Sequence, residues 1–130
     1  MVPLHSPQDY VFNLYTTSSS EAKRLWRKHI KEQWNHQCAY CESDQNLTLD
    51  HIIPQSKGGT DFTKNIVCCC HSCNQSKSHT PWEEWYSSQE FFSEENHKKI
   101  KNWMKPDAPI NLYSYRPNKT LFTTQLTQEP

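Results

Sequence analysis

The sequence predicts a small α+β fold in which a β-hairpin lies between helices and a bound metal ion holds the chain together. Apolar residues with helical spacing begin near Ser20. Farther along, two short apolar runs at residues 47–53 and 65–69 are separated by turn-forming residues, which is typical of a hairpin. Two Cys-x-x-Cys pairs enclose these runs. At 130 residues the chain is the size of one domain, so we expect these features to form one folded unit.

The composition predicts a thin apolar core. Only 34% of the residues are hydrophobic, and the mean hydropathy is −0.97. The sequence has neither a secretion signal nor an apolar stretch long enough to cross a bilayer, so we expect a soluble, cytoplasmic protein with no membrane partner. Thiols stay reduced in that compartment, which favours metal binding over disulfides for the six cysteines.

The charges are balanced overall but unevenly distributed. The formal net charge is zero, which argues against a protein that coats nucleic acid by electrostatics alone. Basic residues concentrate in residues 23–31 and 98–105, and acidic residues lie between them in residues 83–95. Each basic segment is either a phosphate-binding surface or a solvated helix face, and the sequence leaves both alternatives open.

The first two elements are an arm and a helix. Residues 1–19 lack clear periodicity, and we interpret them as an N-terminal arm. A helix follows, with Ser20 as its predicted N-cap. The apolar residues of this helix fall on one side: Ala22, Leu25, Trp26, Ile30 and Trp34. The helix leads to Cys38, the first residue of the first cysteine pair.

A hairpin with an extended loop follows. Leu47–Ile53 form the first predicted strand, which ends at Pro54. Residues 57–60 supply turn-forming side chains, and Asn65–Cys69 form the second strand. Adjacent residues of a regular strand point to opposite faces, so Asp50 and His51 can share one site only if the strand ends or twists there.

Three helices are predicted after the hairpin. The first covers about residues 73–79. Thr80 as the cap, Pro81 at the first helical position and Glu83 at the third indicate the start of the second. Ser93 is the predicted cap of the last helix.

The sequence after these helices is punctuated by prolines and lacks periodicity. We therefore predict an extended C-terminal tail over residues 106–130. The resulting division is an arm at 1–19, a domain at 20–105 and the tail.

The two cysteine pairs predict a structural zinc site. Cys38 and Cys41 form one Cys-x-x-Cys pair, and Cys70 and Cys73 form the other, a spacing that lets four thiolates converge on one tetrahedral zinc. Structural zinc can contribute on the order of 10 kcal/mol to the folding of a small domain, enough to offset a thin core.

The run of three cysteines at residues 68–70 offers alternative zinc pairings. We choose Cys70 because only Cys70 has a two-residue spacer to Cys73. Cys68 and Cys69 are then expected to be small buried residues of the second strand. His71 remains an alternative ligand.

The residues between the two pairs carry a further motif. Residues 49–59 read Leu-Asp-His-Ile-Ile-Pro-Gln-Ser-Lys-Gly-Gly, Asn65 follows, and residues 70–77 read Cys-His-Ser-Cys-Asn-Gln-Ser-Lys. This pattern resembles the HNH endonuclease family in its zinc-containing form, with Asn in place of the last His. The motif core covers roughly residues 38–78. The resemblance implies a ββα-metal (His-Me finger) core with flanking helices, and it makes residues 20–105 the HNH nuclease domain.

The resemblance also implies roles for individual residues. His51 is the general base, Asp50 and Asn74 bind one catalytic divalent ion, and Asn65 fixes the hairpin and positions His51. A neutral imidazole, with an ordinary pKa of about 6.5, can take a proton from water near neutral pH. Two oxygen ligands leave positions for water and phosphate on Mg²⁺ or Mn²⁺. Lys77 is either a phosphate contact or a surface lysine.

The implied function is metal-dependent hydrolysis of phosphodiester bonds in DNA, leaving 5′-phosphate and 3′-hydroxyl ends. Two alternatives belong to other classes. The first is a zinc-stapled nucleic-acid-binding module, or a partner-dependent nuclease subunit with little activity alone. The second is a protein-interaction module. The complete set Asp50, His51, Asn65 and Asn74 disfavours a pure binding module, which has no need of a base beside a metal site. Neutral net charge is the only support for the interaction module. The residues do not decide between a homodimer and a protein partner.

Overall fold

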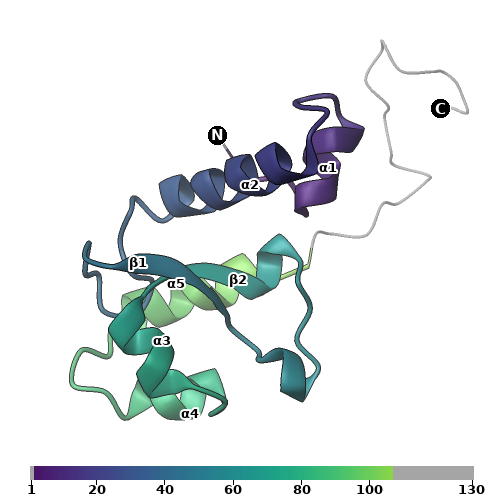
Figure 1. Ribbon diagram of the computed structural model, residues 1–130. Coiled ribbons are helices and arrows are strands. Elements are labelled where there is room, and N and C mark those ends of the chain that lie inside the picture. The colour runs from purple at the N-terminus through teal and green to yellow at the C-terminus, as the bar shows by residue number, and fades with distance from the viewer. Residues whose placement is uncertain (1, 107–130) are drawn as a thin grey trace, which may run out of the picture.

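In the computed structural model, which describes residues 2–106, a two-stranded hairpin lies between helices, so the predicted α+β fold class is confirmed (Figure 1). Nearly all of the predicted tail lies outside the described residues. The elements are, in order, α1 Pro7–Phe12, α2 Ser19–Gln33, β1 Leu47–His51, the 3₁₀ turns η1 Gln55–Lys57 and η2 Thr63–Asn65, β2 Ile66–Cys70, α3 His71–Lys77, α4 Trp82–Ser87 and α5 Glu94–Met104. No helix in residues 2–106 is both long and apolar enough to cross a membrane.

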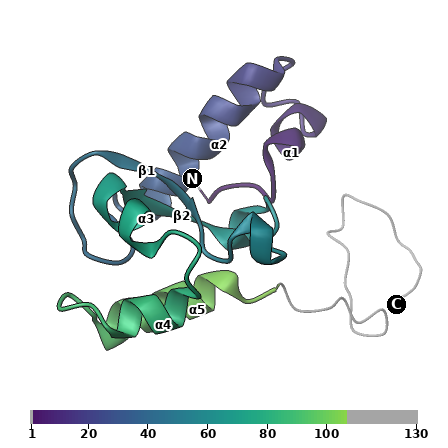
Figure 2. The same cartoon turned by 60° about the horizontal axis from the view of Figure 1, so that its bottom comes forward.

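The hairpin separates two apolar clusters. β1 and β2 pair antiparallel, with Leu47 opposite Cys70 and His51 opposite Ile66. Ile66 joins the cluster that α1 and α2 form, whereas Val67, the next residue, joins the cluster under α3, α4 and α5. Figure 2 shows α4 and α5 on the side of the hairpin opposite α2. Every residue of β2 is buried because both faces of that strand are covered.

Helix α2 begins two residues before the predicted position. Ser18, not Ser20, is the N-cap, and its hydroxyl accepts a hydrogen bond from the backbone nitrogen of Glu21 at 3.2 Å. The predicted apolar side of the helix is correct, with Trp26 and Ile30 among its buried residues. The Trp26 indole Nε1 donates to the Thr63 hydroxyl at 2.7 Å. This bond ties α2 to the end of the hairpin loop.

The predicted arm contains a helix, α1, that the sequence did not reveal. Pro7 occupies its first turn, where a missing N–H costs nothing. Tyr10 is fully buried, and its hydroxyl lies 2.8 Å from Nδ1 of His29 on α2. Burial raises the pKa of Tyr10 and lowers the pKa of His29, so both groups stay neutral near pH 7. Because a six-residue helix is marginal alone, this docking stabilises α1.

The helices after the hairpin differ from prediction at their starts. α3 begins at His71, two residues early, because the Cys70 thiol caps it by accepting from the backbone nitrogen of Cys73 at 3.4 Å. α4 begins at Trp82 with Pro81 at the N-cap, so the predicted cap at Thr80 is wrong. The predicted cap of α5 is confirmed, since the Ser93 hydroxyl accepts from the backbone of the helix.

We predict that Tyr86→Phe destabilises the domain. Tyr86 is fully buried, and its hydroxyl donates to the carbonyl of Tyr40 at 2.9 Å and accepts from the backbone nitrogen of Ser93 at 3.2 Å. Removing the hydroxyl leaves a buried carbonyl without this donor, so the free energy of unfolding should fall by about 1–3 kcal/mol. Urea unfolding of the zinc-loaded protein measures the change. Tyr15→Phe, at an exposed position, serves as the control, and equal midpoints for the two variants would contradict the expectation.

Candidate metal sites and candidate active site

The four predicted zinc ligands converge. The Sγ atoms of Cys38, Cys41, Cys70 and Cys73 all lie within 4.8 Å of one another, and the Cys41 and Cys70 sulfurs are 3.6 Å apart. A tetrahedral zinc with Zn–S bonds of about 2.3 Å places its sulfurs about 3.8 Å apart, so the cluster has the dimensions of a zinc site. Three of the four cysteines are buried, as in a closed structural site.

The remaining cysteines lie outside this cluster. Cys68 and Cys69 are fully buried, as predicted, and the Cys69 thiol donates to the carbonyl of Cys70 at 3.3 Å. His71 is exposed and is not part of the cluster. Hydrogen bonding with the neighbouring Cys69 and Cys73 thiols lowers the pKa of Cys38. Cys70, and neither of its two neighbours, is one of the four converging thiols, and its role as a zinc ligand stays a prediction.

We predict that Cys70→Ala removes bound zinc whereas Cys68→Ala retains it. The two residues lie on the same strand, and both are buried, so the substitutions differ chiefly in the loss of a ligand. Zinc content after dialysis, measured by plasma mass spectrometry, should be close to one ion per chain for wild type and Cys68→Ala and near zero for Cys70→Ala. Zinc loss from Cys68→Ala would show that the pairing of ligands is different.

Asp50 and His51 lie where β1 ends. The Asp50 carboxylate is 7% exposed, and its Oδ2 accepts from the Tyr40 hydroxyl at 3.2 Å and lies 3.1 Å from the Lys77 ammonium. Burial raises the pKa of Asp50, and Lys77 opposes that rise. The His51 imidazole is about one-third exposed, and its Nε2 lies 2.7 Å from Oδ1 of Asp61. The carboxylate is therefore held inside the domain while the imidazole faces solvent.

Lys77 is not the surface lysine that the sequence allowed as an alternative. Its side chain is fully buried, and its ammonium donates to the His51 carbonyl at 2.9 Å and pairs with Asp50. A buried charge of this kind is stable only while its partner is present. Lys77 thereby joins α3 to the end of β1.

Asn65 closes the hairpin loop. Its Oδ1 accepts from the Ile53 nitrogen at 2.9 Å, and its Nδ2 donates to the carbonyls of Ile53 at 3.0 Å and Thr60 at 2.8 Å. Gly59 passes so near that a Cβ there would lie 1.7 Å from the Ile53 carbonyl oxygen, so no larger residue fits. These bonds hold the loop that begins just after His51.

The donor set around Asp50 suits a hard divalent cation. Asn74 is half-buried on α3, and its side chain forms no hydrogen bond within residues 2–106. It precedes Lys77 by three residues, so the two lie on one face of the helix, and Lys77 already reaches Asp50. A carboxylate and an amide oxygen are ligands that Mg²⁺ accepts together with water and phosphate. One positive charge, the Lys77 ammonium, already lies beside the Asp50 carboxylate.

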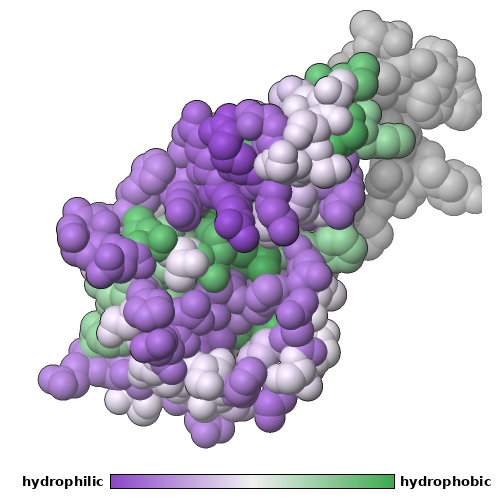
Figure 3. Space-filling view, viewed as in Figure 1, coloured by the Kyte–Doolittle hydropathy of each residue, from purple (hydrophilic) through white to green (hydrophobic). Residues whose placement is uncertain are grey.

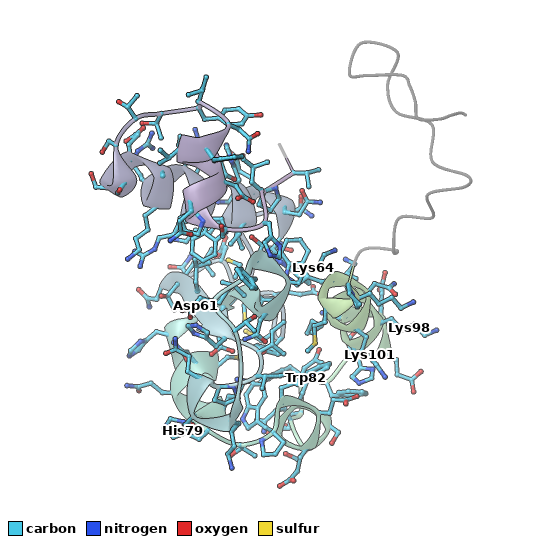
Figure 4. All side chains as sticks on the ribbon, turned by 90° about the vertical axis from the view of Figure 1, so that its right-hand side faces the viewer. Asp61, Lys64, His79, Trp82, Lys98 and Lys101 are labelled. Atoms are coloured by element: carbon cyan, nitrogen blue, oxygen red, sulfur yellow. The ribbon has the colours of Figure 1, made fainter. Side chains whose placement is uncertain are left out.

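The sequence interpretation missed two residues of this region, Asp61 and Tyr40. Asp61 orients His51 and also accepts a hydrogen bond from Gln55 Nε2 at 2.6 Å. Figure 4 shows Asp61 below α2, on the side of the molecule away from the α5 lysines Lys98 and Lys101. In the sequence, Asp61 could have been noticed as an acidic residue directly after the Gly-Gly-Thr turn. Tyr40 was detectable as an aromatic residue inside a cysteine pair.

The geometry can be compared with known proteins. Residues 38–85 match the model of a family described as HNH endonuclease. These residues therefore belong to the HNH endonuclease family. The matched HNH segment contains both cysteine pairs, the hairpin, α3 and the first part of α4. Members of this family are phosphodiesterases that act on nucleic acid. Helices α1 and α2 precede the match.

Two curated proteins and one solved structure are similar to parts of this chain. The chain is 45% identical over 65 residues to the CRISPR-associated endonuclease Cas9 of Corynebacterium diphtheriae, covering 47% of this chain and 6% of that protein. It is 36% identical over 92 residues to YoqL, a candidate HNH endonuclease derived from the SPbeta prophage of Bacillus subtilis, covering 61% of this chain and 39% of YoqL. A solved structure, the Type II-C Cas9 from Actinomyces naeslundii, superposes with a TM-score of 0.46 at 23% identity, over 75% of this chain and 12% of that one.

Proposed function

We propose that this chain is a metal-dependent HNH endonuclease that hydrolyses phosphodiester bonds in DNA. The observation that carries the proposal is the His51 imidazole at the end of β1, which is solvent-accessible and hydrogen-bonded to Asp61, while Asp50, the preceding residue, is buried. The family of residues 38–85 supports the reaction class. The chain spans well under half the length of the curated relatives above, so the activity of the intact protein is part of the proposal.

His51 acts as the general base. The Asp61 carboxylate accepts a hydrogen bond from Nε2–H of His51, and this tautomer leaves the lone pair of Nδ1 available to take a proton from water. The imidazolium that forms is then stabilised by the carboxylate beside it. Asp61 is a positioning residue in this scheme, because it acts on the substrate only through His51.

Asp50 and Asn74 are the proposed ligands of the catalytic divalent ion. When bound, such an ion stabilises negative charge on the phosphate and on the departing oxygen. The chain contributes the orientation of the ligands: Tyr40 and Lys77 hold Asp50 in one position. The expected ends are 5′-phosphate and 3′-hydroxyl.

One observation favours the second candidate, a nuclease subunit with little activity alone. The Lys77 ammonium already balances the charge of Asp50, so the divalent ion must compete with it for the same carboxylate. Nucleic acid or a partner that binds beside this pair can shift the balance toward the ion.

We predict that His51→Ala abolishes cleavage. Loss of a general base typically lowers the rate by about 10²- to 10⁴-fold. Nicking or linearisation of supercoiled plasmid with Mg²⁺ or Mn²⁺ is the measurement, with zinc content checked in each protein. His71→Ala, an exposed histidine of α3, is the control and should cut like wild type. Cleavage that survives in His51→Ala would place the base elsewhere. A wild-type protein that binds plasmid but leaves it intact would favour the binding-module alternative.

We further predict that Asp61→Asn lowers kcat by about 10- to 100-fold, because a hydrogen bond to a charged group contributes roughly 1.5–3 kcal/mol. The substitution removes a negative charge, so DNA binding should not weaken. Steady-state cleavage of a labelled duplex separates kcat from KM, and Asp61→Glu should recover part of the loss. Asp44→Asn is the control, because Asp44 is exposed and forms no hydrogen bond or ion pair with His51. An unchanged kcat would remove Asp61 from the mechanism.

A further inference from the structure

A groove of about 940 Å³ runs between α2 and the hairpin and includes His51. Helix α2 contributes Lys23, Trp26 and Arg27 to its lining. The hairpin and its loop contribute Leu49, His51, Asp61, Phe62 and Ile66. The candidate base therefore lies in a channel with a cationic helix along it. This helix lies outside the segment that matches the HNH family.

A second hollow continues the cationic surface along α2. It has a volume of about 440 Å³, and Lys23 and Arg27 line both hollows. Lys28, Lys31 and His36 extend the lining away from His51. The two hollows therefore share these two cationic residues, and we refer to the two together as the α2 track.

The spacing and exposure of the charges suit a phosphate backbone. Lys23, Arg27 and Lys31 recur every four residues, so they lie on one side of the helix at steps of about 6 Å. Lys23 and Arg27 are exposed, and none of the three forms an ion pair within the described residues 2–106. Each strand of B-DNA carries one negative charge per about 3.4 Å of axis, so the stripe spans several phosphates.

The wall opposite α2 is partly apolar. Leu49 is half-buried, and the ring of Phe62 is 46% exposed and stacks on His5 at 4.2 Å between ring centroids. Figure 3 shows hydrophobic surface between α2 and the hairpin, bordered by the hydrophilic side chains of α2. One basic wall and one apolar wall match a sugar–phosphate chain, with its phosphates toward α2 and its deoxyriboses toward the hairpin.

Tertiary contacts fix the position of α2 relative to the hairpin loop, so the two walls of the groove keep a constant separation. Trp26 lies one residue before Arg27, and its indole donates to Thr63, which lies two residues after Asp61. Thr63 also donates to the N-terminal segment: its hydroxyl donates to the carbonyl of His5 at 2.8 Å, and its backbone nitrogen donates to the same carbonyl at 2.9 Å. The distance from the stripe to His51 is thus determined by buried contacts rather than by long side chains alone.

We propose that α2 binds the DNA backbone next to the bond that is cut, with Lys23 and Arg27 on the phosphates nearest His51 and Lys31 farther along the same strand. This inference rests on the proposed nuclease function for the location of the cut. The basic residues of α5 lie away from this groove: Lys101 lies 3.9 Å from Glu83, and Figure 4 shows Lys98 and Lys101 on the other side of the molecule from Asp61.

The test compares two substitutions that remove equal charge. Lys23→Ala/Arg27→Ala and Lys98→Ala/Lys99→Ala each remove two exposed positive charges. Both are made in the zinc-loaded full chain carrying His51→Ala, so that a fluorescent DNA duplex is bound but not cut. Affinity is measured by anisotropy at several salt concentrations, and the melting temperature verifies folding. We expect the α2 pair to lower affinity roughly 10- to 100-fold and to reduce the slope of log K against log salt by about 2, with the α5 pair within about 2-fold of the parent.

The outcomes separate this inference from the proposed function. Unchanged affinity in the α2 variant, or equal losses in both variants, overturns the track even if wild-type protein cuts plasmid. A selective loss in the α2 variant supports the track as a DNA-binding surface even if wild-type protein leaves plasmid intact, in which case the nuclease proposal alone fails.

Discussion

The convergence of four thiols from two distant parts of the chain is the constraint on which the rest of the structure depends. One pair follows α2, and the other lies at the junction of β2 and α3. A two-stranded hairpin is marginal on its own in water, and this chain has few apolar residues with which to cover one. Holding the start of the hairpin segment against its end closes the part of the chain that contains the candidate active-site residues. The apolar clusters on the two faces of the hairpin then complete the domain.

The same constraint determines the geometry of the candidate active site. Tyr40 lies between the two cysteines of the first pair, is fully buried, and donates to Asp50. Cys70 caps α3, the helix that carries Asn74 and Lys77 toward the end of β1. The four-cysteine cluster and the surroundings of Asp50 are thus adjacent parts of one packed unit. Distortion of the zinc cluster is therefore expected to move Asp50 as well.

The balanced net charge conceals a separation of charge along the molecule. The cations of α2 border the groove that holds His51, whereas the acidic first turns of α4 and α5 lie on the other side of the hairpin. Glu83 in α4 is paired with His97 and Lys101 of α5, so part of the second basic segment is used in packing. A protein of zero net charge can in this way present a cationic surface on one face only.

The sequence by itself determined the features that depend on local spacing. The two-residue spacers indicated the four cysteines that converge, the turn residues indicated the hairpin loop that Asn65 closes, and Ser93 indicated the start of α5. Only the tertiary structure decided which partners these residues meet. Lys77 is buried against Asp50, Asp61 orients His51, and Tyr10 docks α1 on His29, each through contacts between residues 10 or more positions apart. Such contacts leave no periodic trace in the sequence, because they follow from how the elements pack and not from the propensity of any one segment.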